Sequence, residues 1–302
     1  MNNIPILQPK TRSSIEDRVN RILRDLGNPE PPLYLPNVRE LLDLDLNYYR
    51  SDDDGILQEV THRLRIAGKQ VLRKPKRILE AVRQFDLRAL YIPDQQKILI
   101  DQSIPALKHR WLEAHEIGHK VLEWHEACMH GDQDYILRPE AHPKLEAEAN
   151  HAAGHLIFLG DQFIREANDC QISFQTIRLL KQRYGNTFST TLWRFIEQTH
   201  SETPLFGVIG SHPNPPSSHK DRSGPIIRYF IDSPRFRSDF PIVSRQAIEA
   251  FLVFGCKAAK GGMINEGEML IPDGNGIMHS FYFETFYNSH DALTLAHCRR
   301  VA

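Results

Sequence analysis

Cysteine is scarce in this chain, because its 302 residues include only Cys128, Cys170, Cys256 and Cys298. The four lie far apart and form no CxxC pair, which argues against both a zinc ribbon and a disulfide framework. We therefore expect free thiols and a protein of the reducing cytoplasm.

Long apolar runs and an excess of one charge are also absent. No stretch of about 18 apolar residues occurs, and residues 1–5 lack the charged and apolar segments of a signal peptide. The 37 basic and 38 acidic residues give a net charge of −1, so no overall field marks a nucleic-acid or membrane protein. We expect a soluble protein that is not exported and contacts no membrane, and 302 residues suffice for two cores.

The strongest chemical signal is the sequence HEIGH at residues 115–119. On a helix, His115 and His119 fall on one face and can bind one zinc ion, while Glu116 lies beside them. Zinc lowers the pKa of a bound water to about 7, and Glu116 can accept its proton when the water attacks a carbonyl. We expect one helix from Leu107 to Trp124, which is buried because it is apolar on most sides.

Two short apolar runs precede this motif, at residues 90–92 and 98–100, and a proline-initiated turn at residues 93–97 separates them. This pattern predicts a β-hairpin. A sheet edge beside a zinc helix suits a protease, because an extended peptide can add to the edge as a strand and bring its scissile bond to the metal.

A catalytic zinc keeps three protein ligands and one open position, so a third ligand is needed. His125 lies at the spacing of zincins that use a third histidine, but Leu122 replaces the glycine that turns the chain back to the metal. If the helix continues, the residues between rotate His125 by about 240° from His119. We therefore expect His125 at the surface, at the end of the helix.

A second candidate lies within residues 144–159, which are rich in alanine and leucine and predicted to be helical. A carboxylate from a second helix completes the site of the glutamate-type zincins. Glu146 and Glu148 are two residues apart and cannot both face the metal. One should point to it, and the other should be solvated or lie behind a ligand.

Cys128, nine residues after His119, is the third candidate. A thiolate in the open position would displace the water and inhibit the enzyme. The alternative, which we favour, is a buried and inert thiol.

Together these segments resemble the ImmA/IrrE zinc peptidases. The resemblance rests on the short strands, on AHEIGH at residues 114–119, and on EAEAN at residues 146–150 followed by further alanine and leucine positions. The family pattern there is ExxANxFAxxLL followed by Met-Pro, and it implies that Glu146 is the third ligand. Ala152 stands where phenylalanine is usual, and residues 158–159 read Phe-Leu instead of Met-Pro, which are changes in packing and not in ligands.

The first 88 residues read as mainly helical. Ser13 and Glu16 fit a capping box, and Gly27 follows as a helix stop. We therefore expect a first helix that begins after Ser13.

Basic residues outnumber acidic ones in a predicted helical stretch from about residue 55 to 85. This surface could hold the phosphates of a nucleic acid, or its charges could neutralise the acidic run at residues 52–54, and the sequence favours neither. The candidate contacts are Arg63, Arg65, Lys69, Arg73, Lys74, Lys76 and Arg77.

Beyond the peptidase helices, residues 173–198 read as two helices around Gly185. Such a pair permits a helix-turn-helix, although most helix pairs of this kind bind no DNA. Tyr184 could reach a developing oxyanion, but a packed tyrosine is the favoured interpretation. We assign residues 166–200 to a helical connector.

After a loop rich in proline and serine at residues 211–219, strand-like runs at 225–231 and 280–286 flank a predicted helix at 245–254. The alternation predicts a small α/β sensor-like domain, and the family resemblance implies a GAF-like one. The expected fold class is thus α+β: a zincin-like metallopeptidase domain with a small sheet at residues 1–165, the connector, and a C-terminal α/β domain at 201–302.

The resemblance further implies a zinc endopeptidase that cleaves a partner helix-turn-helix repressor. Cleavage would release stress-response, mobile-element or antiphage-defence genes, with the C-terminal domain restraining or triggering it in response to a nucleic acid or small molecule. The alternative is a non-proteolytic regulator that binds DNA or a repressor and keeps zinc as structure. Glu116 argues against this alternative, because a structural site needs no general base.

Overall fold

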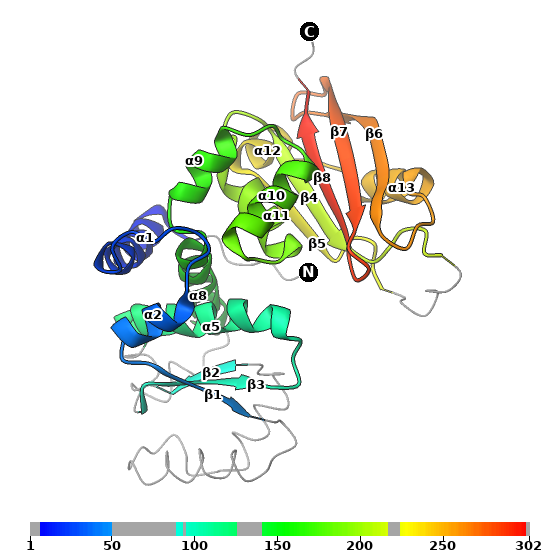
Figure 1. Cartoon of the computed structure of the whole chain (residues 1–302). Coiled ribbons are helices and arrows are strands. Elements are labelled where there is room, and N and C mark those ends of the chain that lie inside the picture. Colours follow the sequence, from blue (N-terminus) through cyan, green and yellow to red (C-terminus); the bar gives the residue numbers. More distant parts are fainter. Residues whose placement is uncertain (1–6, 50–88, 93–94, 126–140, 217–223, 300–302) are drawn as a thin grey trace. The chain divides into compact units, whose positions relative to one another are not determined.

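The computed structural model describes residues 7–49, 89–92, 95–125, 141–216 and 224–299 (Figure 1). The chain has a mixed α and β architecture and divides into two compact units, Met1–Asp161 and Gln162–Ala302. Cys128 and the basic stretch from Arg63 to Arg77 lie outside the described residues, so both remain predictions.

The first unit combines helices with a small sheet. Its described helices are α1 (Pro9–Asp25), α2 (Leu35–Leu41), α5 (Ala106–Val121) and α8 (Ala141–Ile157). Its strands are β1 (Asp45–Tyr49), β2 (Ala89–Ile92) and β3 (Lys97–Asp101). Figure 1 shows α5 between the sheet and α8, and α5 packs against β2, β3 and α8.

The sheet of the first unit has the strand order β1-β3-β2. β1 runs parallel to β3, whereas β2 pairs with β3 antiparallel, in a register that matches Ala89 with Ile100 and Ile92 with Lys97. The predicted β-hairpin is therefore confirmed. Among the described strands, β2 lies at an edge of the sheet and beside α5.

The first helix begins earlier than the sequence predicts. Pro9 starts α1, and Gln8 is its N-cap residue, so the predicted capping box at Ser13 is wrong. Proline is favoured in the first turn because its missing N–H would have no partner there. Glu16 accepts hydrogen bonds from Arg12 and His151 instead of capping the helix.

The HEIGH helix ends sooner than predicted, at Val121. Leu122 is extended, with φ −95° and ψ 90°, and residues 123–125 form a new helical turn. Leu122 is completely buried, and the turn lets Trp124 and His125 hydrogen-bond to Glu148. These contacts outweigh the helical propensity of the segment, which is a weak preference that tertiary packing overrides.

The second unit is a five-stranded antiparallel sheet with helices on both faces. Its strands are β4 (Leu205–Gly210), β5 (Tyr229–Asp232), β6 (Gly262–Pro272), β7 (Met278–Tyr287) and β8 (Ala292–Cys298), in the order β5-β4-β8-β7-β6. Its helices are α9 (Gln162–Asn168), α10 (Phe174–Tyr184), α11 (Phe188–Gln198), α12 (Pro234–Asp239) and α13 (Arg245–Gly255). The predicted helix at 245–254 is thus confirmed as α13.

Aromatic residues form the cores on the two faces of this sheet. Phe206, Phe281 and Phe283 pack with α12 and α13 on one face. Phe286 points to the other face and stacks on Phe174 of α10. The strands alternate their side chains between the faces, as the period of a strand requires.

Helices α10 and α11 belong to this second unit and do not form a separate connector. Gly185 between them has a positive φ of 65°, as expected for a residue that ends a helix. Every residue of α11 is buried or half-buried, because the helix packs on α9, α10 and strands β4, β5 and β8. This burial favours a packing helix over one that enters a DNA groove, and the helix-turn-helix remains a prediction.

Tyr184, at the end of α10, is completely buried, and its ring lies 5.2 Å from that of Phe163. It is thus the packed tyrosine that the sequence favoured.

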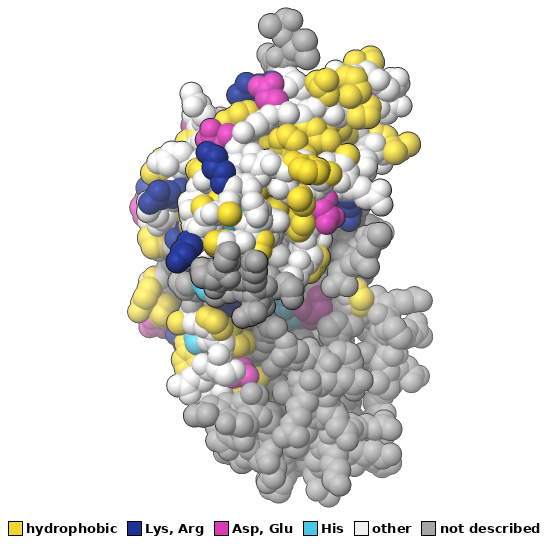
Figure 2. All heavy atoms as spheres, turned by 90° about the vertical axis from the view of Figure 1, so that its right-hand side faces the viewer, with side chains coloured by type: hydrophobic (Ala, Val, Ile, Leu, Met, Phe, Trp, Pro, Cys, Tyr) yellow, Lys and Arg dark blue, Asp and Glu magenta, His cyan; other side chains and the backbone are white. Residues whose placement is uncertain are grey.

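Some apolar side chains of the second unit are exposed, and Figure 2 shows hydrophobic side chains grouped on the upper part of the face in view. Leu270, Ile277 and Met278 are exposed near the turn between β6 and β7, and Met263 is exposed at the other end of β6.

The three cysteines in the described part of the chain, Cys170, Cys256 and Cys298, are free thiols. None of the described helices is both long and apolar enough to cross a membrane.

Candidate metal centre

Three side chains from two helices converge on one point in the first unit. His115 and His119 lie one turn apart on α5, and their Nε2 atoms are 3.2 Å from each other. Glu146 of α8 places Oε2 3.2 Å from His115 Nε2 and Oε1 3.6 Å from His119 Nε2. In the described part of the chain, these three form the one cluster of histidine, cysteine and acidic side chains with the spacing of a metal site.

These distances fit a tetrahedral zinc ion. Zinc binds histidine nitrogen at about 2.0–2.1 Å, so two ligand atoms of a tetrahedral site lie about 3.3 Å apart. The three spacings of 3.2, 3.2 and 3.6 Å are close to this value. The geometry therefore suits three protein ligands with one position left open.

Small residues allow the two helices to approach so closely. A Cβ atom on Gly118 would lie 2.8 Å from the backbone oxygen of Ala149 and 3.3 Å from the Cβ of Ala152. Ala152 thus lies at the contact between α5 and α8. This close contact brings Glu146 within reach of both histidines.

Asn150, one turn beyond Glu146 on α8, orients His115. Its Oδ1 lies 3.0 Å from His115 Nδ1, and an amide oxygen can only accept. In the neutral imidazole the proton is therefore on Nδ1, and Nε2 keeps its lone pair for a cation. Histidine ligands of metals usually donate their second ring N–H in this way.

His125 is not at the surface, so the sequence prediction for it is wrong. It is 0% exposed, with Nδ1 2.9 Å from His119 Nδ1 and Nε2 3.0 Å from Glu148 Oε2. The prediction assumed a continuous helix, whereas the extended Leu122 turns the chain back. Of the two glutamates, Glu146 is the one that faces the histidines, and Glu148 lies behind them.

Glu116 lies beside the three converging side chains without belonging to them. It is 6% exposed, and burial raises its pKa to about 7. The charge of Glu146 acts in the same direction, while His115 and a hydrogen bond from the backbone of Tyr91 on β2 oppose it. A carboxylate with a pKa near 7 is suited to take up and release a proton at neutral pH.

The charges of the three converging groups suit a cation. Burial lowers the pKa of His119 to about 4, so its imidazole is neutral at pH 7. Burial would raise the pKa of Glu146, but the neighbouring His115 and His119 hold it well below its ordinary value. Burial also lowers the pKa of His115, yet Glu146 and Glu116 raise it above the ordinary value, so a cation here competes with a proton.

The four residues predicted from the motifs, His115, Glu116, His119 and Glu146, are thus brought together. The hydrogen-bonded residues behind them, His125, Glu148 and Asn150, were not assigned these contacts from the sequence. The asparagine of the EAEAN segment was the one available signal, because it lies one turn from Glu146 on the same helix.

The sequence matches no family model and no curated protein. Among solved structures, one described as a Mycobacterium tuberculosis transcriptional regulator is similar, with a TM-score of 0.51 and 12% sequence identity. The match covers 94% of this chain and 87% of that one. At this identity the likeness concerns the fold alone, so this chain shares its mixed α and β fold with that structure over nearly its whole length.

Proposed function

We propose that this chain is a zinc metalloendopeptidase of the ImmA/IrrE type, with His115, His119 and Glu146 as ligands and Glu116 as general base. The observation that carries the proposal is the position of Glu116. It is buried beside the three converging side chains, where a structural zinc site would need no further carboxylate.

The chain's own residues would divide the chemistry between them. His115, His119 and Glu146 would hold a zinc ion, which would act as a Lewis acid and lower the pKa of a bound water to about 7. Glu116 would take the proton at its carboxylate as the water attacks the peptide carbonyl, and would then donate it to the leaving amine. Burial of Glu116 assists both steps, because its raised pKa of about 7 favours proton transfer in either direction.

Strand β2 is the proposed binding surface for the substrate. It is an edge strand among the described strands and packs on the helix that carries the two histidines. An extended peptide can pair with such an edge and lie next to the site. The resemblance to ImmA/IrrE proteins makes a helix-turn-helix repressor the proposed substrate, and stress-response, mobile-element or antiphage-defence genes the ones released in the cytoplasm.

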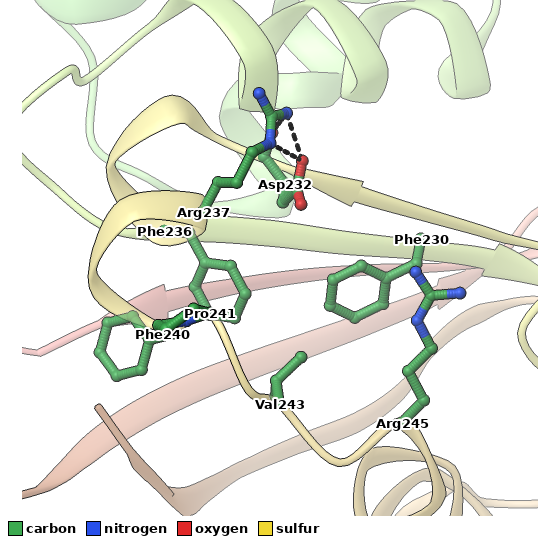
Figure 3. Close-up of a pocket in the computed structure, with 8 residues that line it drawn as sticks. All are labelled: Phe230, Asp232, Phe236, Arg237, Phe240, Pro241, Val243 and Arg245. Carbon is green, nitrogen blue, oxygen red and sulfur yellow. Dashed lines mark hydrogen bonds and ion pairs between the residues drawn. The ribbon is translucent and has the colours of Figure 1, made fainter. Parts of the chain in front are cut away.

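The second unit is the proposed sensor, of a GAF-like kind, for a small molecule or nucleic acid. It has a pocket of about 330 Å³ between β5, α12 and the start of α13 (Figure 3). Phe230, Phe236 and Phe240 give the pocket an apolar wall. Arg237 lines it while paired with Asp232, and the guanidinium of Arg245 lies over the ring of Phe230. A flat ligand suits this aromatic lining, because it can stack on the rings.

Cleavage of the repressor encoded next to its gene tests the proposal. The purified protein with zinc is expected to cleave that repressor, whereas Glu116→Gln should retain zinc and cleave nothing. Glu123→Gln is the matched control, because Glu123 is exposed in the helical turn that follows α5 and pairs with Arg18. Loss of activity in the control as well, or no cleavage by the zinc-loaded protein, would contradict the proposal.

A second candidate function is a non-proteolytic transcriptional regulator with a structural zinc. The observation that favours it is the fold shared with a structure described as a transcriptional regulator. The same experiment separates the two, because this candidate requires wild type and Glu116→Gln to relieve repression equally.

A further inference from the structure

A buried chain of three side chains runs from one of the converging histidines to a carboxylate. The chain consists of His119, His125 and Glu148, which are 5%, 0% and 2% exposed. The contacts are 2.9 Å between the two Nδ1 atoms and 3.0 Å between His125 Nε2 and Glu148 Oε2. We call these three residues the relay.

The hydrogen bonds of the relay determine where its protons lie. The carboxylate of Glu148 accepts, so His125 Nε2 carries a proton. A neutral His125 then has a lone pair on Nδ1, and the contact between the two Nδ1 atoms needs a proton from His119. His119 is therefore protonated on Nδ1, and its Nε2 lone pair points to Glu146 and His115.

Two further side chains contact the carboxylate of Glu148 at the end of the relay. Trp124 Nε1 donates to Glu148 Oε2 at 2.7 Å, and Lys144 Nζ lies 3.9 Å from Glu148 Oε1. Both groups favour Glu148 as an ionised acceptor. Since its two ring nitrogens already contact His119 and Glu148, His125 has none left for a metal.

The other converging histidine has a different support. His115 donates to the neutral amide of Asn150, whereas the relay behind His119 ends in a carboxylate. A carboxylate behind a histidine fixes its tautomer and makes it a stronger metal ligand.

We infer that His125 and Glu148 are positioning residues, which hold His119 as the Nδ1-protonated tautomer and direct its Nε2 to a zinc ion. The inference rests on the zinc site of the proposed function. Loss of such a partner typically lowers metal affinity 10–100-fold.

Nitrogen NMR of the zinc-loaded wild-type protein tests the tautomers directly. Long-range ¹H–¹⁵N correlations are expected to show a proton on His119 Nδ1 and on His125 Nε2. A proton on His125 Nδ1, or a metal-bound His119 Nδ1, would overturn the inference. This measurement needs no variant, so it does not depend on how well a mutant folds.

Zinc affinity, measured by competition with a chromophoric chelator, is the second test. His125→Phe keeps a ring but removes both nitrogens, and it should weaken zinc binding about 10–100-fold. Glu148→Gln should weaken it less, because the amide oxygen can still accept from His125. His109→Phe is the matched control on α5, the helix that carries His119. His109 bonds to the backbone oxygen of Ile104, and this variant should bind zinc as wild type does.

The outcomes separate this inference from the proposed function. A folded His125→Phe protein with wild-type zinc affinity overturns the inference, even if the protein is a peptidase. Zinc binding that depends on His125, in a protein that cleaves nothing, supports the inference and contradicts the peptidase. A wild-type protein that binds no zinc contradicts both.

Discussion

Asn150 illustrates how one neutral side chain controls the chemistry of a histidine. It carries no charge and would not be a metal ligand, yet its amide oxygen fixes the proton of His115 on Nδ1. Without it, the imidazole could rotate or change tautomer, and Nε2 would no longer be held toward Glu146. The proposed zinc site thus depends on residues behind the ligands as much as on the ligands.

We predict that Asn150→Ala weakens zinc binding about tenfold or more, because His115 loses its acceptor. Asn150→Asp should restore most of the affinity, since a carboxylate oxygen accepts the same hydrogen bond. Competition with a chelator measures both values. Equal affinity in the alanine variant and the wild type would contradict the role assigned to Asn150.

Contacts between residues one helix turn apart could be predicted from the sequence. Contacts that depend on a local change of backbone conformation could not. The spacing of His115 and His119 follows from the helix period, and the two-helix arrangement with Glu146 follows the family pattern. His125 was misplaced because its position depends on one extended residue, Leu122. Leucine is a common helix residue, so the residue type of Leu122 does not predict that α5 ends here. The helix ends because the following residues pack around Glu148.

At the scale of elements, the contact between α5 and α8 sets the distance between the ligands. Gly118 is the closest point, because a Cβ there would approach the Ala149 oxygen to 2.8 Å. The neighbouring atom is backbone, which cannot rotate away as a side chain can. The helices would have to separate to admit a methyl group, and Glu146 would then move from the histidines.

We predict that Gly118→Ala both destabilises the protein and weakens zinc binding. An exposed Gly→Ala change in a helix would stabilise by about 1 kcal/mol, but overpacking typically costs about 1–3 kcal/mol. Urea unfolding and chelator competition measure the two effects. Lys108→Ala, at an exposed position of the same helix, is the control and should change neither. A stabilised Gly118→Ala protein with normal zinc affinity would contradict the proposed packing.

Helix α1 is joined to α8 through Glu16. Its carboxylate accepts hydrogen bonds from Arg12 at 2.9 Å and from His151 at 3.0 Å. Burial would raise the pKa of Glu16, but these two partners lower it from 4.5 to about 2. A carboxyl group with a lowered pKa in the folded state stabilises the protein above its unfolded pKa, and this stabilisation is lost as the pH falls to the folded pKa.

We therefore predict that the stability difference between wild type and Glu16→Gln is constant above about pH 5 and shrinks as the pH falls from 4.5 toward 2. Urea unfolding in zinc-free buffer measures it, so that protonation of the zinc ligands does not contribute. Glu40→Gln, on a different helix, serves as the control. A difference that grows toward low pH would show that the ion pair does not have this role.

Helices and strands with a clear local sequence pattern could be predicted. The role of a helix that depends on which elements it packs against could not. The hairpin of β2 and β3 and the helix α13 follow from alternation and helix period in the sequence. The pair α10 and α11 was also located, but its role was not, because a helix packed on a sheet and a DNA-reading helix have similar sequences. The burial of α11 favours the helix packed on a sheet.

At the scale of the whole molecule, the chain consists of two units, each with its own core. Its length predicted two cores, yet the expected boundaries after residues 165 and 200 differ from the single division at Asp161 and Gln162. The helices α10 and α11 bury their apolar sides on the sheet of the second unit, whose strands come later in the sequence. Such long-range packing cannot be read from local composition.

This division predicts where zinc acts on stability, because the proposed ligands all lie in the first unit. A ligand that binds the folded state at 100 times its Kd stabilises by about 2.7 kcal/mol. Zinc should therefore raise the unfolding temperature of the first unit alone. Calorimetry measures the unfolding transitions of both units. In a Trp193→Phe variant, Trp111 and Trp124 remain as fluorescent reporters of the first unit. His115→Ala should abolish the shift without moving the other transition, whereas a zinc-dependent shift of both units together would mean that they unfold as one.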